Sequence, residues 1–102
     1  MDRESKKLLS LIERPNFLGL NDEYFEYFND EINLILKSVI GKPLEAVCFN
    51  LFHYTDDWDI RERDLAYREM QNKELLKLIT CLKTGNYEAA QKISFLQDSG
   101  EL

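Results

Sequence analysis

The sequence predicts an all-α fold, a single compact bundle of about five to six helices over residues 1–102 that ends in a helical hairpin. Apolar residues recur at the three- and four-residue spacing of an amphipathic helix along most of the chain. Asparagine, glycine and proline fall between these periodic segments, where helices begin and end. A chain of 102 residues has the length of one domain and can bury a single core.

The first predicted helix covers residues 3 to 14. Pro15 ends it, because the residue before a proline is disfavoured in the helical conformation. Residues 15 to 20 then form a connector to the next helix. The apolar side of the first helix consists of Leu8, Leu9, Leu11 and Ile12.

The second predicted helix runs from about residue 22 to 40. Asn21 is expected to cap its N-terminus, and Gly41 follows its last turn. Asp22 and Glu23 lie at the positive end of the helix dipole, where carboxylates are stabilising. One side of this helix is apolar and is predicted to face the core, through Phe25, Phe28, Ile32, Ile35, Leu36 and Val39.

A third helix is predicted from Pro43 through about Phe52, because proline suits the first turn of a helix. Nearly every side of this segment is apolar, so it is expected at the centre of the bundle. A short apolar run of this kind can also form a buried strand, and periodicity does not separate the two. The sequence leaves residues 44–53 open between helix and strand.

Residues 53 to 59 are predicted to form a loop that leads into a charged, largely solvent-facing helix from about residue 58 to 71. Asp64 and Arg68 in this helix are expected to form an i,i+4 ion pair.

A helical hairpin is predicted over residues 72 to 97. Asn72 is expected to cap its first arm, Gly85 to end that arm, and Asn86 to cap the second arm.

The net charge of −6 is concentrated in one part of the chain. Residues 20 to 60 carry nine acidic residues against Lys37 and Lys42, a net charge of −7, so the remainder sums to about +1. This negative field disfavours nucleic acid and acidic membranes, and it steers a basic protein partner toward the surface. No apolar run approaches the roughly 20 residues that span a bilayer, so no membrane partner is expected.

The first acidic-aromatic cluster is NDEYFEYFNDE, residues 21 to 31. On the predicted helix, Phe25 and Phe28 face the core, whereas Tyr27 lies among carboxylates on the outer face. Either a neighbouring helix covers Tyr27, or Tyr27 is an aromatic anchor for a partner. The second interpretation predicts a partner-binding set of Glu23, Glu26, Tyr27, Asp30 and Glu31.

The second acidic-aromatic cluster is YTDDWD, residues 54 to 59. Its acids are also suited to helix capping, and Trp58 to packing in the core. The two clusters hold eight of the nine acids between residues 20 and 60, more than capping requires. This surplus predicts a second partner-binding set of Tyr54, Asp56, Asp57, Trp58 and Asp59.

No catalytic, cofactor-binding or metal-binding residues are predicted. His53, the only histidine, lies about 140° around a helix from Cys48, so the two do not share a face as a nucleophile and its base do. Zinc needs three or four ligands, and His53, Cys48 and Cys81 lack the close spacings of such a site. The chain is therefore not expected to be an enzyme.

The two cysteines lie among apolar residues in helical patterns. They are predicted to be buried thiols rather than a disulfide. The start of the chain, MDRESKKLLSLIERP, has the pattern of an amphipathic helix and no export signal. Both observations favour a cytoplasmic location.

Residues 51 to 59, LFHYTDDWD, resemble the F-H-x-D-W-D segment of some immunity proteins from contact-dependent growth inhibition systems. Here two additional residues separate Phe52 and His53 from the D-W-D triplet. The small size, the acidity and the acidic-aromatic clusters also resemble the wider class of bacterial immunity proteins. This resemblance implies a stoichiometric inhibitor that neutralises a cognate basic toxin, such as a nuclease, by covering part of its surface.

The alternative hypothesis is a small helical adaptor or regulatory subunit that recruits a cellular protein through an exposed groove. The sequence does not indicate an oligomeric state.

Overall fold

A computed structural model describes residues 2–18 and 20–95 of the chain. Within these residues the chain forms seven α-helices and no strand, so the predicted all-α fold is confirmed. Residues 44–53, which the sequence left open, are helical. The helices are α1 (Arg3–Ile12), α2 (Pro15–Leu18), α3 (Asp22–Ser38), α4 (Pro43–Asp56), α5 (Trp58–Arg63), α6 (Leu65–Lys83) and α7 (Tyr87–Lys92).

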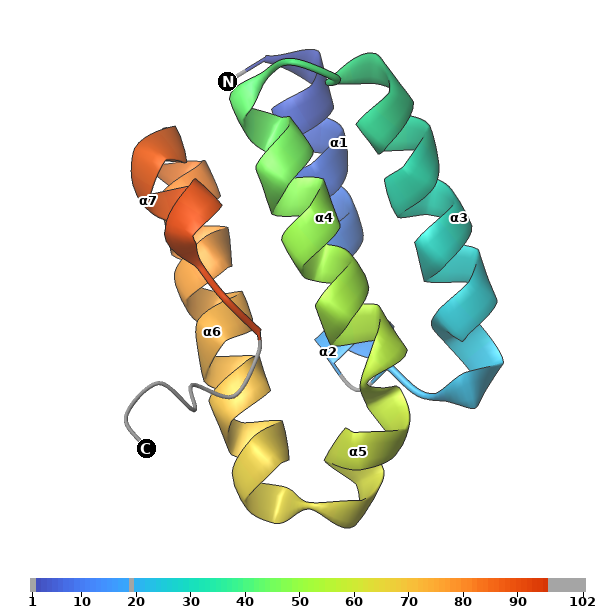
Figure 1. Ribbon diagram of the computed structural model, residues 1–102. Helices are drawn as coiled ribbons and strands as arrows, with labels where there is room; N and C mark the ends of the chain where they lie inside the picture. Colours follow the sequence, from blue (N-terminus) through green and yellow to red (C-terminus); the bar gives the residue numbers. More distant parts are fainter. Residues whose placement is uncertain (1, 19, 96–102) are drawn as a thin grey trace.

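The helices form a bundle around one core (Figure 1). Helices α3 and α4 lie side by side, α1 packs behind them, and α6 lies on the other side with α7 folded back along it. Four aromatic rings fill the middle of the core. Phe17 stacks on Tyr54 with centroids 5.3 Å apart, and it meets Phe28 edge-on at 4.8 Å. Phe95 packs against Tyr54 with ring centroids 5.3 Å apart, so the last described residue contacts the centre of the core.

Helices α1 and α3 lie where the sequence placed them, each with its end two residues earlier than predicted. Asn21 caps α3 as predicted, because its side chain accepts a hydrogen bond from the backbone nitrogen of Glu23 at 3.0 Å. Gly41 has a φ of 81°, a left-handed conformation that glycine adopts without strain. The connector predicted at residues 15 to 20 is instead partly helical, and α2 carries Phe17 into the core.

The loop predicted at residues 53 to 59 is wrong for most of its length. Helix α4 continues through Asp56, because Tyr54 and Thr55 are fully buried and extend its core-facing side by another turn. The chain first breaks at Asp57, and α5 begins at Trp58. The single helix predicted from about residue 58 to 71 is also wrong, because Asp64 separates α5 from α6.

Helix α6 is one continuous helix, so the break predicted at Asn72 is wrong. The polar side chain of Asn72 lies within the helix because it has a tertiary partner, the Tyr54 hydroxyl, 2.7 Å from its Oδ1. The ion pair predicted between Asp64 and Arg68 is also not formed. Asp64 caps α6 by accepting from the Tyr67 nitrogen at 3.0 Å, and Arg68 Nε donates to the backbone oxygen of Arg61.

The predicted helical hairpin is formed by the second half of α6 together with α7. Gly85 has a φ of 73° at the turn, and Asn86 caps α7 by accepting from the Ala89 nitrogen at 3.2 Å. Helix α7 ends at Lys92, five residues before the predicted end, and residues 96 and 97 lie outside the described residues.

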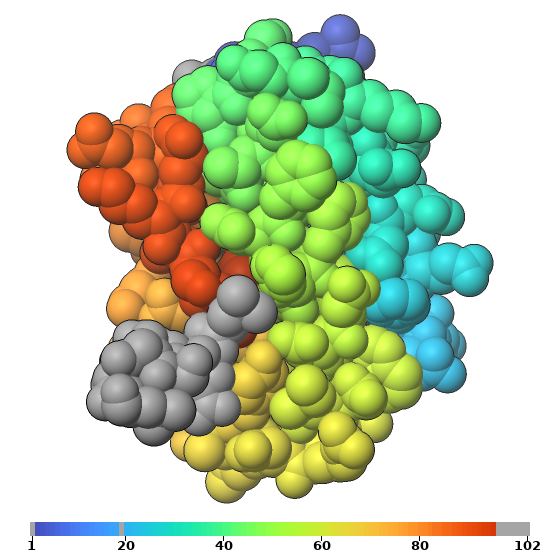
Figure 2. All heavy atoms as spheres, viewed as in Figure 1, coloured from blue at the N-terminus to red at the C-terminus, as the bar shows by residue number. Residues whose placement is uncertain are grey.

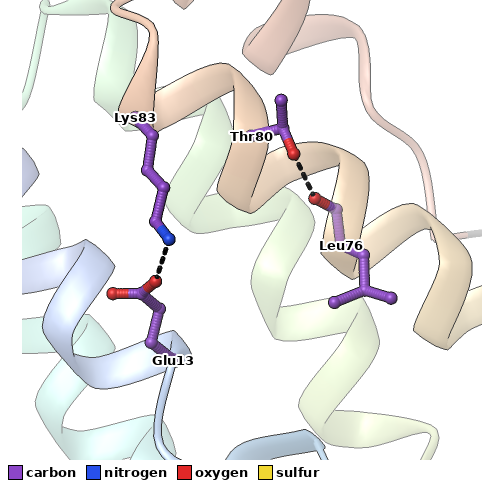
Figure 3. A network of polar contacts seen from close by, with 4 residues as sticks. All are labelled: Glu13, Leu76, Thr80 and Lys83. Carbon is purple, nitrogen blue, oxygen red and sulfur yellow. Dashed lines mark hydrogen bonds and ion pairs between the residues drawn. The ribbon is translucent and has the colours of Figure 1, made fainter.

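An ion pair joins α1 to the far end of α6. Lys83 Nζ lies 2.7 Å from Glu13 Oε2, and Figure 3 shows the two side chains reaching toward each other from their helices. The Thr80 hydroxyl nearby bonds within α6, to the backbone oxygen of Leu76. Both members of the ion pair are exposed, so it contributes less than about 1 kcal/mol. The helix arrangement therefore depends mainly on the apolar core.

Candidate protein-binding surface

The outer face of α3 presents the first acidic-aromatic cluster. Glu23, Glu26, Tyr27 and Asp30 are exposed, and Glu31 is half-buried. At 100° per residue these five side chains occupy about 140° of the helix circumference. Within residues 2–18 and 20–95, none of the four carboxylates is in an ion pair. The structure thus brings the whole predicted set together as one negatively charged face.

Tyr27 is held in place from two sides. Its ring packs edge-on against Phe28 with centroids 5.2 Å apart, and its hydroxyl accepts a hydrogen bond from Arg14 Nη1 at 2.7 Å. The side chain is nevertheless 42% exposed. Arg14, in the turn after α1, and Phe28 therefore contact part of the ring while the rest of it is open, and the anchor role of Tyr27 stays a prediction. A fixed side chain loses little conformational entropy when a partner binds it.

The second cluster does not form a comparable surface, because Tyr54 is fully buried. Its hydroxyl lies 2.7 Å from both the backbone oxygen of Leu18 and Oδ1 of Asn72. Burial raises the pKa of Tyr54 to about 12, since the ionised form is disfavoured away from water. The prediction that Tyr54 contacts a partner is therefore wrong, and its role is to join α2, α4 and α6.

Asp57 also faces inward, toward α6. Its Oδ2 accepts hydrogen bonds from the Tyr67 hydroxyl at 2.7 Å and from Gln71 Nε2 at 2.9 Å. Gln71 is fully buried, and its Nε2 also donates to the backbone oxygen of Phe95 at 2.8 Å. Desolvation, with the hydrogen bond to Asp57, raises the pKa of Tyr67 to about 12. The predicted partner-binding residue Asp57 is thus engaged inside the protein.

Arg61 completes this internal network. Its guanidinium lies 3.8 Å from the centroid of the Tyr54 ring, and Nη1 donates to Gln71 Oε1 at 2.6 Å and to the backbone oxygen of Tyr54. The side chain is 4% exposed, and Nη2 has no hydrogen-bond partner among the described residues. Burial lowers the pKa of Arg61, because a charge is costly away from water.

The remaining members of the second cluster are divided. Trp58 is half-buried against the core, whereas Asp56 and Asp59 are exposed. The Thr55 hydroxyl donates to Oδ1 of Asn29, which joins the end of α4 to α3. Figure 2 shows the first half of α3 beside the last turn of α4 and the start of α5. Asp56 and Asp59 are thus exposed on segments that lie beside α3.

Sequence reasoning missed Arg14 and Arg61. Arg14 is thirteen residues from Tyr27, beyond the range of helical spacing, so no local pattern relates the two. Arg61 had a weak signal, since it lies among apolar and acidic residues seven positions after Tyr54, but the turn between α4 and α5 conceals that relation.

The cysteines and histidine form no reactive pair. Both cysteines are free, Cys48 is buried and Cys81 is half-buried, so the prediction of two buried thiols is correct only for Cys48. Burial raises the pKa of Cys48 to about 12, which keeps it in the unreactive thiol form at neutral pH. His53 is exposed on the same helix. In the described part of the chain, no three His, Cys, Asp or Glu residues are grouped to hold a metal ion.

Comparison with protein-family models, with curated proteins and with solved structures finds no match to this chain. Among the described residues, no helix combines the length and the apolar character needed to cross a bilayer.

Proposed function

We propose that this protein is a stoichiometric inhibitor that binds a basic protein partner through the outer face of α3, as immunity proteins do when they neutralise a toxin. One observation carries the proposal: Glu23, Glu26 and Asp30 are exposed without ion pairs around Tyr27, which Arg14 and Phe28 hold in place. A fixed aromatic ring within a charged rim has the composition of an interface hot spot.

The charges and the ring have different tasks in this proposal. The carboxylates attract lysines and arginines of the partner during approach, which mainly raises the association rate. Tyr27 supplies the apolar contact that slows dissociation. Asp56 and Asp59 extend the negative surface beside α3, whereas Tyr54 and Asp57 stabilise the fold behind it.

The test begins with the open reading frames beside the gene for this chain. Where one of them encodes a basic toxic protein, the activity of that protein is assayed with increasing amounts of the purified chain. Toxin activity should fall to zero at a one-to-one ratio. The double variant Glu23→Lys/Asp30→Lys should slow association by about tenfold at low salt and by less at high salt, where charges are screened. Glu69→Lys, at an exposed position of α6, is the control for a charge change away from the α3 face and should affect the rate much less.

Two results would count against the inhibitor. One is a toxin that stays active with excess protein, and the other is a Glu69→Lys variant that slows association as much as the α3 double variant.

The alternative function, a helical adaptor, is favoured by a separate observation, an open groove between α1 and α3. Two variants distinguish the two functions. Glu23→Lys/Asp30→Lys should slow binding through the charged α3 face, whereas binding in the groove should persist in that variant and weaken in Lys7→Gln.

A further inference from the structure

A groove of about 690 Å³ lies between α1 and α3, which run antiparallel to each other (Figure 1). Arg3, Lys7, Ser10 and Arg14 line it from the α1 side, at the four- and three-residue spacing of one helix face. From Arg3 to Arg14 the groove follows about three helical turns, or about 16 Å. A partner helix of about eleven residues has this length.

The floor of the groove is apolar. Leu11 of α1 and Ile35 of α3 lie at the bottom and are almost fully buried, whereas Leu34 on the α3 wall is 58% exposed. At one end the hydrogen bond from Arg14 to Tyr27 connects the two helices. An exposed leucine above a buried apolar floor is the arrangement that takes up the apolar side of an amphipathic helix.

The charge of the groove is opposite to that of the whole chain. Its lining contains four cations against Glu4 and Glu31, a net charge of +2, whereas the whole chain carries −6. The cations are Arg3, Lys6, Lys7 and Arg14. Within the described residues none of them forms an ion pair. A positive rim attracts an acidic partner and repels a second positive groove, so two copies of this chain do not pair through this surface.

We propose that the α1–α3 groove is a docking site for an acidic amphipathic helix of a partner protein. The apolar side of that helix covers Leu34 and the floor beside it, and its carboxylates pair with Arg3 and Lys7 on α1. This inference goes beyond the proposed inhibition, because it concerns a partner of the opposite charge. The two sites adjoin, since Glu31 and Leu34 of the groove lie on the same face of α3 as Tyr27.

A designed peptide provides a direct test. A fluorescein-labelled peptide of about 14 residues, with leucines at i, i+3, i+4 and i+7 and glutamates on both flanks, spans the groove. A matched peptide carries lysine in place of each glutamate. Fluorescence anisotropy should show saturable binding of the acidic peptide and binding of the lysine peptide at least about tenfold weaker at low salt.

Paired variants locate the peptide on the protein. Leu34→Ser should weaken binding of the acidic peptide by about tenfold, the effect of losing a central apolar contact. Leu76→Ser should have no effect, because this leucine of α6 is exposed to a similar extent, 55%, but lies outside the groove. Lys7→Gln should weaken binding by about threefold, and Lys73→Gln on α6 should not.

Three results would overturn the docking site: equal binding of the two peptides, equal effects of Leu34→Ser and Leu76→Ser, or sedimentation showing that Leu34→Ser breaks a dimer of this chain. Lys7→Gln separates this proposal from the inhibitor proposal, because Lys7 lies on α1 and not on the α3 face. Loss of peptide binding in Leu34→Ser with full toxin neutralisation supports both proposals, and peptide binding without any neutralisation supports the groove alone.

Discussion

Both acidic-aromatic clusters combine carboxylates with aromatic rings. The first presents carboxylates and Tyr27 to solvent, whereas the second directs Tyr54 and Asp57 into the protein. Residues 21 to 31 lie on one uninterrupted helix, so its periodicity separates Phe28, which is buried, from Tyr27, which is exposed. Residues 54 to 59 cross the break between α4 and α5, where the chain turns toward α6. Composition therefore does not distinguish a surface from a core. The packing and hydrogen-bond partners on neighbouring helices do.

The polar groups near Tyr54 are stable inside the protein because nearly all of them are paired. Gln71 bonds to Asp57, Arg61 and the Phe95 carbonyl, so one amide connects three segments. A buried group that loses its partner costs about 1–3 kcal/mol. On α3, by contrast, the carboxylates are hydrated and removing one leaves nothing unpaired.

The largest effect on stability is expected at Tyr54, in the second cluster. Tyr54→Ala should lower the free energy of unfolding by roughly 3–5 kcal/mol, because it removes a fully buried ring together with contacts to Phe17 and Phe95. Urea unfolding followed by circular dichroism measures this change. A loss below about 1 kcal/mol would mean that Tyr54 is no more part of the core than a surface tyrosine.

Alkaline pH should act on the same residue. The pKa of Tyr54 is raised to about 12 in the folded state from 10.0, so its contribution is complete below pH 10 and is lost as pH rises through about 12. This loss amounts to about 3 kcal/mol, at about 1.4 kcal/mol for each pKa unit. Urea unfolding at pH 8 and pH 11 should show a smaller decrease for Tyr54→Phe, and an equal decrease would assign the pH effect to other groups.

Asp57 and Asp56 provide a matched pair of adjacent acids. Asp57→Ala should lower stability by about 1–3 kcal/mol, since Tyr67 and Gln71 both lose an acceptor. Asp56→Ala, at an exposed position, should change stability by less than about 0.5 kcal/mol. Thermal melts of the two variants compare them directly, and similar melting temperatures would remove the distinction between inward and outward acids.

The effect of Tyr27 on stability is expected to be small. Tyr27→Ala should lower stability by no more than about 1 kcal/mol, because its hydrogen bond to Arg14 is exposed to water. The same variant should instead weaken binding of the basic partner by roughly 2 kcal/mol, the scale of an aromatic hot spot. Calorimetric titration with the toxin candidate measures the second quantity. An unfolded Tyr27→Ala variant would place Tyr27 with Tyr54 among the structural residues.

Local signals explain what the sequence predicted correctly. The caps at Asn21 and Asn86 and the glycines at 41 and 85 act within a few residues, so they identified the ends of α3 and the turn of the hairpin. Tyr54 also had a usable signal, since residues 44, 47, 51 and 54 continue one helix face. Its pairing with Asn72 had none, because it joins residues eighteen apart in different helices. The α3 face was predictable because it depends on helical spacing within one helix. The second cluster was not, because its environment depends on residues of other helices.

The hydrogen bond from Gln71 to the carbonyl of Phe95 delays closure of the core during synthesis of the chain. Phe95 packs on Tyr54, so the core cannot close around that ring until residue 95 has been synthesised. The two ends of this bond are 24 residues apart, and at about 5–20 residues per second the ribosome needs about 1 to 5 s to cover that distance. During this interval the nascent protein exposes apolar surface around Tyr54, and such surface favours aggregation of incompletely folded chains.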